Sequence, residues 1–268
     1  MKAKKSFAAR VYRRSADLVE TLLPRGLVTP AHYAARRATG RLEAEHDMLV
    51  SMVARGKTAV DVGANIGIFT YAFLARGANV VAIEPQSSCA RLIDAFYRSG
   101  FPRTKQRGAL EVHVAALGAT SGTATLSVPL KDGKVDHESA SLSNDSPGSI
   151  KIEVPIRRLD DFGLDNVHVI KMDVEGNEIH ALEGASHTIR RWKPAILVEI
   201  EQRHHSEPIA AVFSRIREIT GRGYAISFLR HDGQLHPLAE FDVEKDQLSL
   251  ADDPLSRRYV RNFFLLAD

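Results

Sequence analysis

The sequence predicts an α/β fold in which helices cover both faces of a mostly parallel, doubly wound sheet. A buried strand at 59–62 leads through a glycine-containing turn into an apolar segment with helical spacing at 68–75, and a second strand follows at 79–83. The runs 167–173 and 195–200 are apolar almost throughout, as expected of parallel strands that are buried on both faces. With 268 residues, of which 44% are hydrophobic, the chain can bury one sizeable core.

Residues 1–57 precede this unit and are expected to form an N-terminal helical extension, broken at Pro24-Arg25-Gly26 and again near Pro30. Apolar residues recur near its start at helical spacing, a pattern typical of a basic amphipathic helix in peripheral contact with anionic lipid. The simpler alternative is a solvated helix that frays at the chain end. The net charge is only +3, yet several basic residues come before the first acidic one: Lys2, Lys4, Lys5, Arg10, Arg13 and Arg14.

Two absences in the sequence narrow the class of protein. No apolar run approaches the ~20 residues of a membrane-spanning helix, and no apolar segment of a secretory signal follows the first charges. Only one cysteine, Cys89, is present, which excludes an internal disulfide and a cysteine-rich zinc site. We therefore expect a cytoplasmic protein in which Cys89 packs into the core from a helix.

An insertion is expected after the third strand, which the pattern places at 111–117. The segments 122–128 and 150–157 alternate in polarity like two strands and predict an inserted β-hairpin. Between them, 131–149 is rich in Gly, Pro, Ser, Asn and Asp and poor in apolar residues. A loop of this length inside a compact domain is usually functional or disordered, so we predict a mobile lid over the substrate, with a plain surface loop as the alternative.

The rest of the pattern completes the alternation of strands and helices. Two late strands are expected to extend one edge of the sheet, and the helices suffice to cover both of its faces. The elements not yet named are helices at 90–98, 178–192 and 206–220 and strands at 224–229 and 262–266.

The turn after the first strand carries the pattern Asp61-x-Gly63-x-Asn65-x-Gly67. A dinucleotide site that starts at Gly63 would need glycines at 65 and 68, where this chain has Asn65 and an isoleucine. An acidic residue that enters a loop without a pyrophosphate cradle suits a cationic nucleoside without phosphate, such as S-adenosylmethionine. Gly63 permits a tight turn, and Gly67 permits a close approach of backbone to the ligand. Glu84, at the tip of the second strand, can accept hydrogen bonds from ribose hydroxyls.

Five segments, from about Glu43 to the C-terminus, are similar in content and order to the FkbM family of class I S-adenosylmethionine-dependent methyltransferases. They are Asp-Val-Gly-Ala-Asn-Ile-Gly at 61–67, Ile-Glu-Pro at 83–85, Arg-Leu-Asp-Asp-Phe at 158–162, Ile-Lys-Met-Asp-Val-Glu-Gly-Asn-Glu at 170–178 and Asn-Phe-Phe at 262–264. The resemblance implies a Rossmann-like sheet of about seven strands in a methyltransferase domain at 58–268. It also implies methyl transfer to a hydroxyl of a sugar, polyketide or other small molecule or glycan.

The cofactor candidates combine the glycine turn with the tips of the neighbouring strands. Class I enzymes usually offer a polar group near the adenine at the end of the third strand. This chain has Ala115 and Ala116 there, so adenine recognition would rest on backbone groups and apolar contact. The predicted cofactor-binding residues are Asp61, Gly63, Ala64, Asn65, Gly67, Glu84, Ala116 and Asp173.

Two pairs of acidic residues are expected at adjacent strand tips, Asp173 with Glu175 and Glu199 with Glu201. Residues two apart in an extended strand share a face, and the two strands should be neighbours. Such carboxylates can hold the amino group of the cofactor's methionine, orient the acceptor hydroxyl, or bind a divalent cation such as Mg²⁺. The metal candidates are Asp173 and Glu199. For Glu201 a solvated strand end is the alternative.

Methyl transfer to a hydroxyl is an in-line displacement, and an alcohol is a poor nucleophile until its proton is removed. A histidine that titrates near neutrality is the natural base. His204 and His205 directly follow the fifth strand, and His204 is preferred because it lies nearer the strand tip. The predicted catalytic residues are therefore His204, Asp173 and Glu175. The alternative is that the adjacent histidines are simply solvent-exposed.

Two other functions fit parts of the sequence. An RNA ribose 2′-O-methyltransferase would need a Lys-Asp-Lys-Glu set, and Lys171, Asp173 and Glu199 resemble part of one. No lysine occurs near the end of the fifth strand, and the aromatic content of 7% is low for base stacking, which disfavours nucleic acid as a partner. The second alternative is a non-catalytic S-adenosylmethionine-binding module, against which the intact Asp61, Glu84 and Asp173 count.

Overall fold

The computed structural model describes residues 22–131, 133–142, 148–221, 223–253, 256 and 258–267. The basic segment at 2–14, for which we predict an amphipathic helix and lipid contact, lies outside these residues. Among the residues that are described, no helix combines the length and the apolar composition needed to cross a bilayer.

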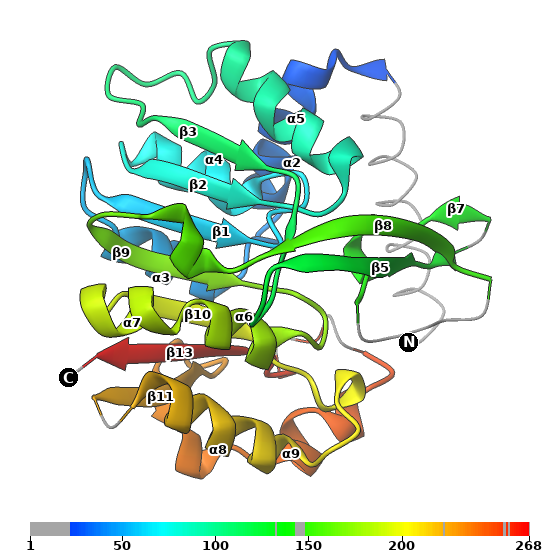
Figure 1. Cartoon of the computed structure of the whole chain (residues 1–268), viewed down its shortest axis with the longest axis vertical. Coiled ribbons are helices and arrows are strands. Elements are labelled where there is room, and N and C mark those ends of the chain that lie inside the picture. The colour runs from blue at the N-terminus through cyan, green and yellow to red at the C-terminus, as the bar shows by residue number, and fades with distance from the viewer. Residues whose placement is uncertain are drawn as a thin grey trace.

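The centre of the fold is a mostly parallel sheet (Figure 1). Its strands are β1 (Thr58–Val62), β2 (Asn79–Ile83), β3 (Leu110–His113), β9 (Val167–Met172), β10 (Ala195–Glu199), β11 (Tyr224–Leu229), β12 (Leu235–Pro237) and β13 (Asn262–Ala267). They lie in the order β12-β11-β13-β10-β9-β1-β2-β3, and β13 is antiparallel to both of its neighbours. The predicted doubly wound α/β fold is confirmed. β12 adds an edge strand to the seven that were expected.

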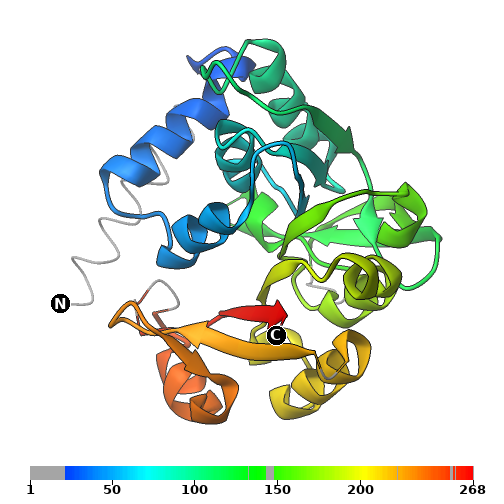
Figure 2. The same cartoon turned by 90° about the vertical axis from the view of Figure 1, so that its left-hand side faces the viewer.

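Helices cover both faces of this sheet (Figure 2). One face carries α3 (Ala44–Met52), α4 (Ile68–Ala75) and α5 (Ser87–Arg98), with α2 (Arg25–Ala38) packed on α4 and α5; the other carries α6 (Glu178–Gly184), α7 (Ser186–Trp192) and α8 (Ile209–Thr220). Side chains alternate along a strand, so Ala59 of β1 belongs to the first core and Val60 to the second. Cys89 is buried on α5, as predicted.

Two helices differ from the expected pattern. The break near Pro30 was wrong: α2 begins at Arg25 and continues through Pro30, where the missing N–H costs one hydrogen bond near the helix start. The single helix expected at 178–192 is divided at Ala185 into α6 and α7. The break occurs where Gly184 packs so closely on the insertion that an added Cβ would lie 2.1 Å from the carbonyl oxygen of Gly118.

The third strand is shorter than expected, because the chain leaves the main sheet after His113 and enters a second, smaller sheet. This sheet has the order β4-β8-β5 and contains the predicted antiparallel pair, which extends beyond the main sheet (Figure 1). Its strands are β4 (Ala116–Leu117), β5 (Gly122–Val128) and β8 (Ile150–Arg157). Within the predicted lid, the described residues form β6 (Leu130–Lys131), β7 (Lys134–Val135) and the 3₁₀ turn η1 (His137–Ser139); residues 132 and 143–147 lie outside the described chain.

Short elements follow the central strands near the site. These are the 3₁₀ turns η2 (Leu159–Phe162), η3 (Gln202–His204), η4 (Leu238–Glu240) and η5 (Leu248–Leu250) and the helix α9 (Val243–Asp246). Because β1, β2, β9 and β10 are parallel, their carboxyl ends meet at one edge of the sheet, where ligands bind in open α/β folds.

Candidate active site

A pocket opens at the carboxyl ends of β1, β2 and β9. It holds about 590 Å³ of empty space, part of it open to solvent. The predicted site residues that line it are Gly63, Asn65, Glu84, Ala116, Asp173 and Glu175. Ala115 and Leu117 also line it, so backbone and apolar groups face the region predicted for the adenine.

Glu84 is held by backbone donors at the tip of β2. Its Oε2 accepts from the backbone N–H of Asn65 and its Oε1 from that of Gln86, each at 2.8 Å. Burial raises the pKa of Glu84 to about 7, against the lowering effect of these two hydrogen bonds. A desolvated carboxylate that is oriented on the pocket wall fits the paired hydroxyls of a ribose.

Asp61 lies behind this wall and holds the turn together. Its Oδ2 accepts from the backbone N–H and the hydroxyl of Thr70 at 2.9 and 2.6 Å. Lys171, on β9, donates to the carbonyl of Gly63 at 3.0 Å and lies 4.0 Å from Oδ1 of Asp61. Burial opposes charge on Lys171, but the carboxylates of Asp173 and Asp61 outweigh it and raise its pKa. The contacts of Asp61 and Lys171 therefore stabilise the glycine turn at 63–67 from behind the pocket wall.

The two glycines of the motif are needed for different steric reasons. Gly63 has φ +67°, and a Cβ there would lie 1.8 Å from the carbonyl oxygen of Asp173, so the loop passes directly over the end of β9. Gly67 has φ +85°, but a Cβ there would meet Ile93 at 2.9 Å in α5. The close approach expected of Gly67 is thus to a helix. Ala64 is buried in the core under α4 and α5, and neither it nor Gly67 lines the pocket.

The opposite wall is the turn after β9. Glu175 has a φ of +51° and is followed by Gly176 at +96°, a backbone conformation that is rare for glutamate and common at functional sites. The amide of Asn177 donates to the carbonyl of Leu117 at 2.8 Å and joins this turn to the insertion. The turn presents the side chains of Asp173 and Glu175 to the pocket.

The described part of the insertion reaches both walls of the pocket. His137 Nδ1 lies 2.5 Å from Oε1 of Gln86, and Nε2 of Gln86 donates to the carbonyl of His137 at 2.9 Å. Burial lowers the pKa of His137, so the ring is neutral at pH 7. At the other end, the hydroxyl of Ser141 donates to the carbonyl of Glu175 at 2.6 Å. The segment 137–142 therefore spans the mouth of the pocket.

His204 lies between two carboxylates. Its Nε2 is 2.8 Å from Oε2 of Glu175 and 3.8 Å from Oε1 of Glu201. Burial opposes its protonation, but the hydrogen bonds to Glu175 and Glu201 outweigh burial and raise the pKa of His204 to about 9. The pKa of His204 therefore lies above the near-neutral value that was predicted, which favours a protonated ring at neutral pH. His205 instead contacts Glu178, with 3.2 Å between Nε2 and Oε2.

Glu201 is a structural partner of His204 and lies under it. Its carboxylate contacts Arg203 at 2.6 Å and accepts a short hydrogen bond from the hydroxyl of Tyr259. Burial alone would raise its pKa, but hydrogen bonds from His204, Tyr259 and Arg203 lower the pKa of Glu201 to about 2. The solvated strand end considered for Glu201 does not occur, since its side chain is 1% exposed.

Glu199, the metal candidate on β10, takes part in an ion-pair cluster. Arg261 Nε lies 3.5 Å from Oε1 of Glu199, and the same guanidinium pairs with Glu43 at the start of α3. Burial and the carboxylate of Asp173 raise the pKa of Glu199 well above its ordinary value. Across the described ranges, no three His, Cys, Asp or Glu side chains converge as a metal site requires. The two acids at which Mg²⁺ binding was considered are thus each paired with a cationic side chain, Glu199 with Arg261 and Asp173 with Lys171.

Several residues of the site were not found from the sequence. Gln86 lies two residues after Glu84 and could have been inferred from its position at the strand tip. No sequence motif marks Tyr259 or Arg261, which precede the last strand. His137 lies in a segment with little apolar content. Their roles depend on contacts between segments that are far apart along the chain.

Comparisons with known proteins agree with this geometry. The sequence model described as "Methyltransferase FkbM domain" matches residues 61–226. A methyltransferase FkbM from Methylobacillus flagellatus KT is similar in structure, with 19% identity and a TM-score of 0.50; the match covers 96% of this chain and 60% of the length of that chain. No curated protein matches the sequence significantly.

Two further solved structures match at lower similarity. A TehB-like SAM-dependent methyltransferase from Corynebacterium glutamicum has 11% identity and a TM-score of 0.43, over 89% of this chain and 99% of that one. A magnesium protoporphyrin IX methyltransferase from Synechocystis PCC 6803 with bound SAM has 12% identity and a TM-score of 0.39, over 91% and 79%. The family match extends from the glycine turn to β11 and so includes the pocket walls. The chain belongs to the FkbM family of class I S-adenosylmethionine-dependent methyltransferases.

Proposed function

We propose that this chain is an O-methyltransferase that methylates a hydroxyl of a small molecule or glycan, with S-adenosylmethionine as the methyl donor. When bound, the cofactor supplies a methyl group on a sulfonium centre. The observation that supports the proposal best is the pocket itself, which places a buried carboxylate, Glu84, at one end and the Asp173 and Glu175 turn at the other. The methyltransferase domain would comprise residues 58–268, and residues 1–57 would be its helical extension.

The wall residues fit the chemistry of the donor. Glu84 would accept hydrogen bonds from the ribose hydroxyls, and Ala116 would contact the adenine in the apolar part of the pocket. Asp173 lies beside Gly63 and would hold the amino group of the methionine part. Asp61, Ala64 and Gly67 would support the loop of Gly63 and Asn65 from behind.

The acceptor hydroxyl would be deprotonated by the pair of His204 and Glu175. The two groups share one proton near neutral pH and must release it before they can take the proton of the hydroxyl. Glu175 lines the pocket, so it would contact the hydroxyl, while His204 orients the carboxylate and delocalises the charge. General-base catalysis of this kind is worth roughly 10²–10⁴-fold in rate.

Calorimetric titration with S-adenosylmethionine tests the cofactor, with NAD as the control and with runs in the presence and absence of Mg²⁺. We expect micromolar binding of S-adenosylmethionine alone, unchanged by Mg²⁺. A second assay measures transfer of a labelled methyl group to a panel of sugar and polyketide alcohols. Absence of binding to folded protein would favour a different role, and methylation of RNA but of no alcohol in the panel would favour the ribose 2′-O reaction.

A further inference from the structure

A second cavity lies beyond β11, at the same edge of the sheet as the pocket. β11 runs parallel to β10 because both are antiparallel to β13, so Arg230 follows β11 at the edge where Glu199 and Glu201 end β10. The cavity has about 510 Å³ of empty space including its open mouth, enough for a phosphate ester. Its lining residues are Arg230, His231, Lys245, Asp246, Arg258 and Val260.

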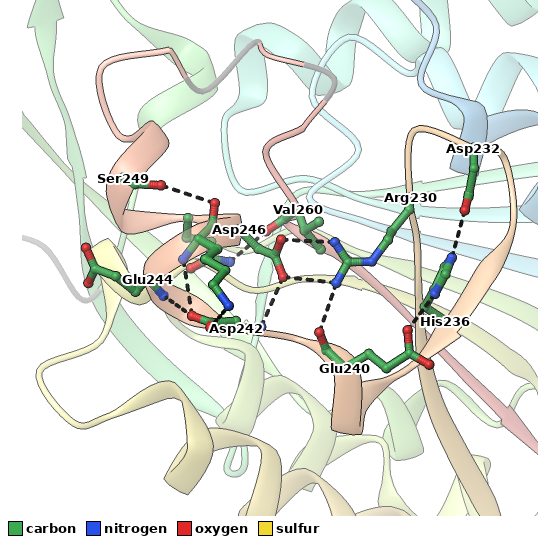
Figure 3. Close-up of polar contacts among 11 residues, drawn as sticks. Arg230, Asp232, His236, Glu240, Asp242, Glu244, Asp246, Ser249 and Val260 are labelled. Atoms are coloured by element: carbon green, nitrogen blue, oxygen red, sulfur yellow. Dashed lines mark hydrogen bonds and ion pairs between the residues drawn. The ribbon is translucent and has the colours of Figure 1, made fainter.

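Arg230 is held in a fixed orientation on the wall of this cavity (Figure 3). Its guanidinium lies 3.2 Å from Oδ1 of buried Asp246, donates to the carbonyl of Glu240 at 2.9 Å and lies over the ring of Phe228. A guanidinium has five N–H donors, so these contacts leave donors for a ligand. A preorganised arginine loses little conformational entropy when it binds an anion.

Two further cationic side chains and a histidine line the cavity. Lys245 pairs at 3.1 Å with Asp242, outside the cavity, and is otherwise exposed. Among the described residues, neither the guanidinium of Arg258 nor the imidazole of His231 has a hydrogen bond or ion pair. Of the three permanent cations on the lining, Arg230 is paired with Asp246 and Lys245 with Asp242, which leaves the charge of Arg258 unbalanced within the part of the chain that the structure describes. Arginine and lysine side chains are suited to the oxygens of a phosphate monoester, which carries about −1.5 to −2 charges at pH 7.

One buried residue joins the cavity to the loop that carries His204. The amide of Gln247, which follows Asp246, donates to the carbonyls of Ile200 and Val260 at 2.8 Å each. Its Oε1 accepts from the backbone N–H of Gln202, the first residue of η3, at 2.8 Å. The wall of the cavity and the loop of His204 are therefore parts of one hydrogen-bonded unit.

We propose that this cavity binds a phosphate group of the methyl acceptor, which would make the substrate a phosphorylated sugar or glycan. The proposal rests on the proposed function for the nature of the acceptor, but the phosphate site itself can be tested alone. Arg230 and Arg258 would contact the phosphate, Lys245 would add charge, and the sugar would extend over η3 toward Glu175 and His204.

Phosphate binding is measured by calorimetry on the full chain with inorganic phosphate and with glucose 6-phosphate. We expect both to bind, and Arg258→Gln or Lys245→Gln to weaken each by about tenfold, since each variant removes one charged contact. Both residues are exposed, so neither variant should unfold the chain. Lys105→Gln, which removes an exposed charge in the turn before β3, is the matched control and should leave binding unchanged.

The outcomes separate the parts of the proposal. No binding of either compound, or equal binding in the Arg258 and Lys245 variants, overturns the phosphate site. Tighter binding of inorganic phosphate than of glucose 6-phosphate shows a site for a free anion and overturns the assignment to an acceptor. Tighter binding of the sugar phosphate supports it. Calorimetry with S-adenosylmethionine on the same samples tests the proposed cofactor site separately from the phosphate site.

Discussion

The two halves of the strand-end edge are stabilised by different interactions. In the half at β1 and β2, where we propose that the cofactor binds (the cofactor half), Glu84 is held by the backbone N–H groups of Asn65 and Gln86. In the half at β9 and β10, where we propose that the acceptor binds (the acceptor half), side chains contact side chains, and Glu201 is surrounded by Arg203, His204 and Tyr259. The pKa shifts follow this difference, since burial raises that of Glu84 to about 7, while its partners lower that of Glu201 to about 2. The backbone N–H groups that orient Glu84 do not titrate, so we expect that geometry to change little with pH. The orientation of Glu201 depends on ion pairs, so we expect it to change with pH and with the loss of any partner.

The largest effect is expected at the histidine of the acceptor half. His204→Asn should reduce turnover by roughly 10²–10⁴-fold and leave cofactor affinity intact, because Glu175 loses the partner that orients it and delocalises its charge in the proposed base. Wild-type turnover should rise as the pH approaches about 9, where the pair loses its proton, and the variant should lack this rise. Steady-state methyl transfer across pH measures both. His187→Asn on the surface of α7 is the control, and full activity of His204→Asn would exclude His204 from the base.

The next effect concerns the ion-pair cluster at Arg261. Arg261→Met leaves the partly buried carboxylates of Glu43 and Glu199 without their cation and should cost about 1.5–3 kcal/mol of unfolding free energy in urea denaturation. Arg191→Met removes an exposed pair with Asp165 and should cost less than about 1 kcal/mol. Equal losses in the two variants would show that burial of the cluster contributes nothing.

The cofactor half should respond through affinity. Glu84→Gln should weaken S-adenosylmethionine binding by roughly 100-fold, since charge-assisted hydrogen bonds to the ribose become neutral ones. Wild-type affinity should increase as pH rises through about 7, because only the ionised carboxyl accepts both hydroxyls, and the variant should bind independently of pH. Calorimetry at several pH values measures this. Glu111→Gln on exposed β3 is the control, and retention of wild-type affinity in Glu84→Gln would remove Glu84 from the ribose site.

The smallest effect is expected at Tyr259. Tyr259→Phe removes one hydrogen bond to Glu201 and should cost about 1 kcal/mol of stability. Because the pKa of Glu201 is lowered in the folded chain, its contribution is present above the ordinary glutamate pKa of about 4.5 and is lost as pH falls toward about 2. Urea denaturation of both proteins should therefore give curves that converge in acid. If the stability difference between wild type and Tyr259→Phe stays the same at low pH, the hydrogen bond to Glu201 is not its cause.

The sequence predicts the cofactor half better than the acceptor half for a physical reason. The turn at 61–67 and the tip at Glu84 are local backbone features, and their glycines and carboxylate are visible in a short motif. Tyr259 and Arg261 reach Glu201 and Glu199 only because β13 pairs with β10. The spacing of apolar residues along the sequence does not reveal such contacts between distant segments.

The titration of His204 illustrates the same limit. Its place after the fifth strand was predicted correctly, and the structure brings it next to Glu175. Its protonation depends on two carboxylates that face the ring from one side of the site, and that arrangement exists only in the folded chain. Similarly, the boundary of the third strand at His113 depends on pairing of Ala116 with β8, which local polarity does not show.

The segment 137–142 has a consequence for the timing of catalysis. It is hydrogen-bonded to Gln86 beside Glu84 and to Glu175 on the other wall of the pocket. If the pocket holds cofactor and acceptor as we propose, we expect exchange of either ligand through this mouth to break both attachments, so that one opening event sets the residence time of the spent cofactor and the alignment of the next acceptor. A substitution at Ser141 would then alter product release and substrate positioning together.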